Sequence, residues 1–98
     1  MSKFGSLIDI NYPVLLDFFS DWSEPSVTMN LVLRDVAAAI GDKGRVLKIN
    51  VDRNECLVSA LKISRVPTLI IYKDGEMVWR ENGTQDANTL IALMQQYV

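Results

Sequence analysis

The sequence predicts an α/β fold in which a four-stranded sheet carries helices on both faces. Short apolar or β-branched runs alternate with longer segments whose apolar residues recur at helical spacing. A hairpin signal joins the last two of these short runs. We therefore expect a short N-terminal helical turn followed by the order β-α-β-α-β-β-α. At 98 residues the chain has the length of one domain with a single core, so one domain is expected over residues 1–98.

Four segments are expected to form strands. Residues 13–19 are almost continuously apolar, which is typical of a central strand covered on both faces. Residues 46–51 are rich in β-branched side chains. Residues 68–73 and 76–80 flank Asp74-Gly75, the strongest short-range signal for a β-hairpin. The first two strands should be parallel, with a right-handed crossover helix between them, and the last two should be antiparallel.

Helices are expected between and after the strands. In the segment 24–40 the apolar residues are spaced as on one helical face, with Ser23 as N-cap, Pro25 in the first turn and Gly41 at the end. A short helix is expected over 55–63, with Leu57, Ala60 and Leu61 directed inward. The last helix is expected over 86–98, and a short helical turn near residues 3–8.

The composition argues against several classes of function. A formal charge of −2 without any basic cluster disfavours nucleic-acid binding. No apolar run approaches the roughly 20 residues of a membrane span, so no membrane partner is expected. The start, MSKFGSLIDINYP, lacks the apolar region of a signal peptide. The chain has one cysteine, so it cannot form an internal disulfide. It has no histidine, so the usual general base of a hydrolase is missing. Both facts together disfavour a zinc or copper site. No metal and no cofactor is therefore expected.

Three motifs together resemble the thioredoxin family. They are PVLLDFFSDWSEPS, then VPTLIIYKDGE about forty residues later, and then NGT, and the resemblance runs from about Pro13 to Val98. Each motif alone is weak, whereas their joint occurrence in this order within the β-α pattern is specific. The resemblance implies a thioredoxin fold with the strands in the spatial order second, first, third, fourth. The family's first strand is expected to be missing, because only about a dozen residues precede Pro13.

Ser23 and Ser26 occupy positions at which the family usually carries cysteines. The resemblance makes the first position a nucleophilic thiolate at a helix N-terminus and the second the thiol that resolves the mixed disulfide. A serine hydroxyl has nearly the same shape, but it cannot form a disulfide and stays protonated at neutral pH. We therefore expect no thiol–disulfide exchange at this site. In the purely structural interpretation, which we favour for the chain as written, Ser23 is an N-cap and Ser26 a surface hydroxyl.

Asp17 interrupts an apolar strand and is therefore expected to be buried. An unpaired buried carboxyl costs about 1–3 kcal/mol or more. By the resemblance, Asp17 lies behind the resolving position and assists its proton transfers. Two structural alternatives remain at this stage: an ion pair with Lys48 on the neighbouring strand, or a solvated position at a strand end.

The resemblance also implies a substrate groove, formed by Trp22, Pro25, Val66, Pro67 and Gly83. The family's proline at position 67 is cis, although only about 5–6% of X-Pro bonds in folded proteins are cis. This leaves the backbone of Val66 free to pair with an extended peptide. As structural alternatives, Trp22 is a packing residue, Pro25 serves only the helix start, and Gly83 is an ordinary turn glycine.

Cys56 stands apart from these motifs, near the start of the short helix. Free cysteines are mostly small and inert core residues, and we expect this for Cys56, with a dimerising or redox-sensing thiol as the alternative. The second strand is expected to lie at an exposed sheet edge guarded by Lys48, where a dimer could form.

Two explanations of the Ser-x-x-Ser motif stay open at this point. The chain is a cysteine-to-serine form of a protein disulfide reductase, which would be cytoplasmic and would be reduced by a thioredoxin reductase. Alternatively, it is a natural redox-dead module that binds extended protein segments. Glu24, Val27 and Leu31 favour the second explanation, because the family often has glycine, lysine and proline at or near these positions. No sequence feature supports a purely structural domain that uses another surface.

Overall fold

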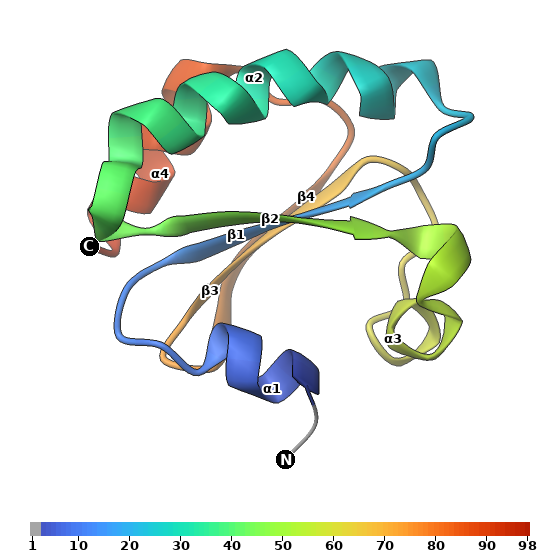
Figure 1. Ribbon diagram of the computed structural model, residues 1–98, viewed down its shortest axis with the longest axis horizontal. Coiled ribbons are helices and arrows are strands. Elements are labelled where there is room, and N and C mark those ends of the chain that lie inside the picture. Colours follow the sequence, from blue (N-terminus) through green and yellow to red (C-terminus); the bar gives the residue numbers. More distant parts are fainter. Residues whose placement is uncertain (1–2) are drawn as a thin grey trace.

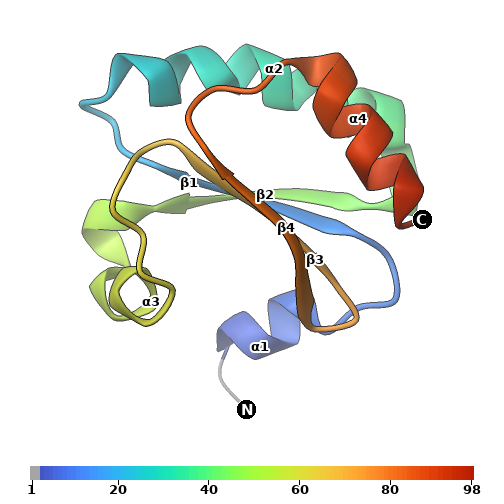
Figure 2. The ribbon, with the colours of Figure 1, turned by 180° about the vertical axis from the view of Figure 1, so that it is seen from behind.

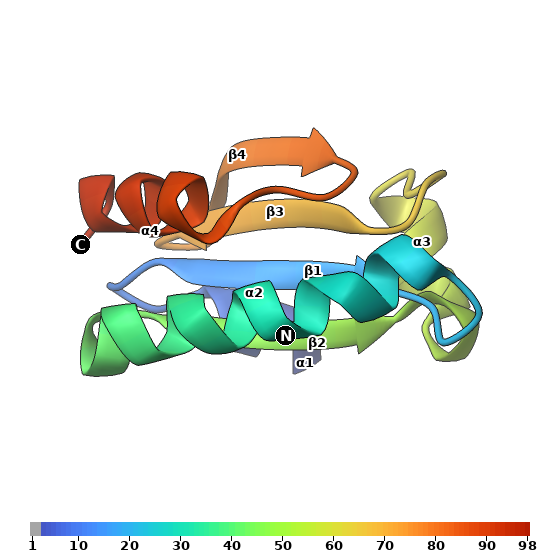
Figure 3. The same ribbon diagram turned by 90° about the horizontal axis from the view of Figure 1, so that it is seen from above.

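The computed structural model describes residues 3–98, and their strands form one mixed sheet with the order β2-β1-β3-β4. The strands are β1 (Val14–Phe19), β2 (Arg45–Asn50), β3 (Thr68–Lys73) and β4 (Glu76–Asn82). β2 runs parallel to β1, while β3 is antiparallel to both β1 and β4. Figure 3 shows the four strands side by side in this order. The predicted fold class and strand order are therefore confirmed.

Helices cover both faces of the sheet. They are α1 (Lys3–Ile8), α2 (Glu24–Ile40), α3 (Glu55–Ala60) and α4 (Ala87–Gln96). α2 and α4 lie over one face, whereas α1 and α3 lie over the other (Figures 1 and 2). Across residues 3–98, no helix has the length and apolar character that crossing a lipid bilayer requires.

β1 lies between two hydrophobic cores, because its side chains alternate between the faces of the sheet. Leu15 points toward α2 and α4, and packs with Leu69 and Ile71 of β3. Leu16 and Phe18 point to the other face, where they pack with the side chains of α1 and α3. This double coverage explains why the strand is apolar almost throughout, as the sequence analysis predicts.

Several predicted boundaries differ from the structure by one to three residues; β4 extends to Asn82 instead of residue 80, and α4 ends at Gln96 instead of residue 98. Val51 does not end β2 but begins a 3-10 turn, η2 (Val51–Arg53), where the side chain of Asn50 accepts a hydrogen bond from the N–H of Asp52 at 2.8 Å. α3 ends at Ala60 instead of residue 63, because the chain turns back on itself there. Ala60 is exposed instead of inward, whereas Val58 is half-buried.

Candidate functional site

The turn between β1 and α2 places the serine pair at the start of a 17-residue helix. Ser23 is the N-cap, as predicted, and its Oγ accepts a hydrogen bond from the backbone N–H of Ser26 at 3.4 Å. Pro25 lies in the first helical turn, where the helix does not use its missing N–H. Any side chain at position 23 therefore lies at the positive end of the helix dipole.

Ser26 is only 1% exposed, so its expected role as a surface hydroxyl is wrong. Helical spacing places it on the same face as Met29 and Leu33, which α2 turns toward the sheet. Its Oγ accepts a hydrogen bond at 3.4 Å from the backbone N–H of Ser20, the residue directly after β1. Ser26 thus joins the first turn of α2 to the strand that precedes it.

Asp17 is fully buried, and neither of its carboxylate oxygens has a hydrogen-bond partner. Desolvation raises the pKa of this carboxyl to about 6, against a weaker opposing effect of the positive charge on Lys48. The Lys48 ammonium instead donates to Oδ1 of Asn30 and lies 4.4 Å from the ring centroid of Phe19. The prediction of a buried carboxyl is confirmed, while the two alternatives, an ion pair with Lys48 and a solvated strand end, are wrong.

Trp22 and Val66 line one cleft of about 260 Å³. Trp22 is 74% exposed, so it does not act as a packing residue. The rest of the lining comes from η2, from α3 and from the loop that precedes Val66. It consists of the apolar residues Val51, Val58 and Ile63 and the polar residues Asp52, Glu55, Ser64 and Arg65.

Sequence reasoning missed these additional lining residues. Ile63 to Arg65 directly precede Val66 in the chain, so their proximity to the groove could have been inferred. The residues of η2 and α3 carry no comparable signal, because only the tertiary structure brings them beside Trp22.

Pro67 and Gly83 meet at a second point, next to the start of β3. The peptide bond between Val66 and Pro67 is cis. The N–H of Gly83 donates to the carbonyl oxygen of Pro67 at 2.8 Å, and Gly83 has a φ of 85°, which favours glycine. Neither residue lines the cleft of Trp22, and neither does Pro25.

Cys56 is exposed, so the expectation of a buried core cysteine is wrong. It lies in the first turn of α3, whose half-buried side chains are Leu57 and Val58. Cys56 borders a wide hollow of about 580 Å³ together with Phe4 and residues 52–57.

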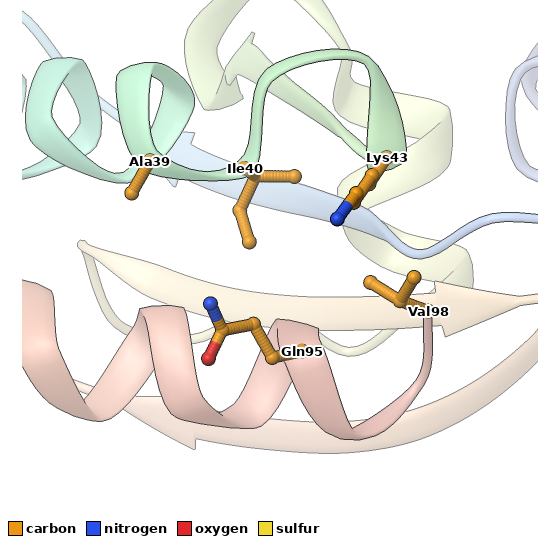
Figure 4. Close-up of a pocket in the computed structure, with 5 residues that line it drawn as sticks. All are labelled: Ala39, Ile40, Lys43, Gln95 and Val98. Atoms are coloured by element: carbon orange, nitrogen blue, oxygen red, sulfur yellow. The ribbon is translucent and has the colours of Figure 1, made fainter.

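A further hollow of about 320 Å³ lies at the opposite end of α2, between that helix and α4. Figure 4 shows Lys43 and Gln95 beside it, with Ile40 and Val98. The carboxyl ends of two helices meet here, and their negative dipole ends oppose an anion despite the lysine. Among residues 3–98, no group of three or more His, Cys, Asp or Glu side chains could hold a metal ion.

The arrangement around α2 thus combines two hydroxyls at a helix N-terminus, a buried carboxyl with a raised pKa and an open cleft beside an exposed tryptophan. The hydroxyls lack any histidine that could activate them, because the chain contains none. Sulfur at the same two positions would instead experience the helix N-terminus, which lowers the pKa of a thiol.

Known proteins share both the sequence pattern and the structure. A family model described as Thioredoxin matches residues 1–96. Thioredoxin Y, chloroplastic, from Oryza sativa subsp. japonica is 35% identical over 91 residues, which cover 92% of this chain and 54% of that protein. A thioredoxin-like protein of Synechocystis is 34% identical over 86 residues, which cover 88% of this chain and 82% of that protein.

A solved structure agrees with these sequence relatives. It is a mutant thioredoxin from Halobacterium salinarum, similar with a TM-score of 0.88 and 34% identity over 99% of this chain and 84% of that chain. The chain spans about half the length of the Oryza protein but most of the other two. The family model, these relatives and the strand order together show that this chain belongs to the thioredoxin family.

Proposed function

We propose that this chain is the scaffold of a protein disulfide reductase in which serine replaces both reactive cysteines. As written, it is inactive in thiol–disulfide exchange at Ser23 and Ser26, and it still binds protein segments beside Trp22, Val66 and Gly83. The catalytic positions are Ser23, Ser26 and Asp17. The substrate-binding residues are Trp22, Pro25, Val66, Pro67 and Gly83.

Asp17 is the observation that carries this proposal. Its carboxyl is fully buried and has no hydrogen-bond partner, and burial of such an unpaired group destabilises the fold. A proton acceptor with a pKa near 6 has a clear use if a thiol must be deprotonated nearby. A helix cap and a buried hydroxyl require no such group.

The exchange reaction assigns a role to each position. With thiols at 23 and 26, the thiolate at 23 attacks one sulfur of a substrate disulfide. The substrate S–S bond breaks as the mixed disulfide forms, and the other substrate sulfur leaves and takes up a proton. The thiol at 26 then passes its proton to the Asp17 carboxylate and attacks the sulfur at 23. The mixed disulfide breaks, and the second substrate sulfur leaves as a thiolate that takes up a proton. The substrate gains two electrons, and the protein keeps an internal disulfide that an external reductant, such as a thioredoxin reductase, must reduce.

A natural redox-dead binding module is the second candidate. Val27 and Leu31 favour it, because they leave apolar side chains 50% and 65% exposed, one helical turn apart on α2. In that case the serines are the native residues, and the chain acts only by binding extended protein segments. The first candidate implies a cytoplasmic protein, because a reductase of this kind acts there. The two candidates differ in one expectation: cysteines at positions 23 and 26 would give disulfide reductase activity only if the first candidate is correct.

An insulin reduction assay with dithiothreitol as the reductant separates the two candidates. The chain is compared with its Ser23→Cys/Ser26→Cys variant, with both single substitutions and with Ala38→Cys, which adds a thiol at an exposed position of α2 outside the site. We expect turnover well above the dithiothreitol background only for the double variant. An inactive double variant that retains the native circular dichroism spectrum refutes the reductase scaffold and leaves the binding module.

A further inference from the structure

The carboxyl end of α3 forms a tight reversal. The N–H of Ile63 donates to the carbonyl of Val58 at 2.9 Å, and the N–H of Lys62 donates to that of Ser59 at 3.2 Å. Lys62 has a φ of 56°, the left-handed conformation that closes such a helix end. Glycine is the usual residue at this position, because other residues adopt the left-handed region with difficulty. The carbonyls of Leu61 and Lys62 at the reversal therefore need partners from outside the helix.

Arg80 of β4 supplies these partners. Its Nη1 donates to the carbonyl of Leu61 at 2.7 Å, and its Nη2 donates to that of Lys62 at 3.0 Å. The guanidinium is a rigid planar fork, so two bonds to consecutive carbonyls fix the orientation of the turn as well as its position. Arg80 is half-buried and sits in the middle of β4, opposite Ile70 of β3. The turn is thus attached to the rigid sheet.

The same turn joins two parts of the cleft beside Trp22. Glu55 and Val58 line the cleft from α3, before the turn, and the residues from Ile63 to Val66 line it directly after the turn. Arg80 itself does not line the cleft. A movement of the turn would therefore change the distance between these two parts of the lining.

The far end of the loop is attached to the sheet independently. Thr68 Oγ1 lies 2.5 Å from the carbonyl oxygen of Arg65 and 3.0 Å from Oδ1 of Asn82, which ends β4. β4 therefore holds both ends of the segment from Leu61 to Thr68. Only the end near Leu61 depends on a side chain with a formal charge.

We propose that Arg80 is a positioning residue for partner binding, which rests on the proposed function of the cleft. It holds the turn after α3 so that the cleft is already formed before a protein segment enters. Without the guanidinium, the turn samples other conformations, and binding must order it again, which lowers affinity. Arg80 touches neither the partner nor the reacting atoms, so the chemical step should not depend on it.

Steady-state kinetics on insulin test the proposal in the Ser23→Cys/Ser26→Cys background. We expect Arg80→Met to raise KM about tenfold and to leave kcat unchanged, because ground-state and transition-state binding weaken equally. The KM of Arg80→Lys should lie between that of the parent and that of Arg80→Met, since an ammonium lacks the planar fork. Arg34→Met serves as the matched control, because Arg34 is an exposed arginine of α2, and it should leave both constants unchanged. If Arg80→Met leaves KM unchanged and lowers only the urea midpoint, Arg80 merely stabilises the fold. That result overturns the proposal.

A binding measurement on the serine form keeps the test independent of thiol chemistry. Reduced and alkylated insulin B chain is titrated into the chain and into its Arg80→Met variant. The fluorescence of the two tryptophans, of which Trp22 lines the cleft, reports binding. We expect about tenfold weaker binding for the variant. Equal affinities, or no binding by either protein, overturn the proposal. Weaker binding by the variant together with an inactive double-cysteine form would refute the reductase scaffold alone.

Discussion

Asp17→Asn is the substitution that tests the electrostatics of the site most directly. The pKa of Asp17 is raised from its ordinary value of 3.8 to about 6, with desolvation as the main cause. Between these two pH values the folded state keeps a proton that the unfolded state has already lost. Stability therefore falls as the pH rises through this window, and it is constant above the folded pKa.

The size of the effect follows from the two pKa values. Each unit of difference between the folded and the unfolded pKa corresponds to about 1.4 kcal/mol, so ionisation of Asp17 removes about 3 kcal/mol of stability by pH 7. Asparagine has nearly the same shape and does not titrate. The difference in unfolding free energy between Asp17→Asn and the parent should therefore change by about 3 kcal/mol in favour of the variant from about pH 3 to about pH 7.

Urea unfolding, followed by tryptophan fluorescence at several pH values, measures this difference. Comparing the change with pH cancels any constant effect of the amide, including its own missing hydrogen bonds. Asp35→Asn controls for the loss of one formal negative charge, because Asp35 is exposed on α2. A difference that stays constant from about pH 3 to about pH 7 contradicts the assignment of a raised pKa to Asp17.

Substitutions at three further positions test a helix cap, the packing and the hydrogen bonds of the fold. Ser23→Ala removes the acceptor for the N–H of Ser26 and should lower the unfolding free energy by about 1 kcal/mol, whereas Ser23→Asp, which can still cap, should not. Gly44→Ala would bring a Cβ to 2.7 Å from the side chain of Ile40, so a loss of about 1–3 kcal/mol is expected, and an unchanged urea midpoint would contradict this crowding. Lys73→Met removes two hydrogen bonds that tie β3 to the N-terminal loop and to the end of α4. It should cost about 2 kcal/mol in thermal unfolding, and an unchanged melting temperature would show that water replaces both bonds.

The serine pair illustrates how sequence and structure divide the information. That Ser23 caps the helix was predictable, because a cap depends only on residues within one turn of chain. That Ser26 is buried was not foreseen, although it lies three residues further along the same helix. Its exposure depends on where α2 rests against the end of β1, which is a tertiary contact.

The polar and reactive residues outside the helix start show the same division. Asp17 was expected to be buried, because its apolar neighbours in the strand require burial on both faces. The missing partner for its carboxyl was not predictable, because Lys48 on the paired strand could reach either Asp17 or Asn30. Cys56 was misplaced in the core because the expectation followed the general tendency of free cysteines to be buried and not the position of this residue on its helix.

By itself, the sequence determined the order and type of the strands and helices, the hairpin at Asp74 and Gly75, and the start and end of α2. These features arise from periodicity, capping and turn chemistry over a few neighbouring residues. Only the tertiary structure decided the shape of the cleft and the attachment of its wall to Arg80. Those features join η2, α3 and β4, which are distant along the chain. Which distant groups a side chain contacts depends on how the helices and strands pack against one another.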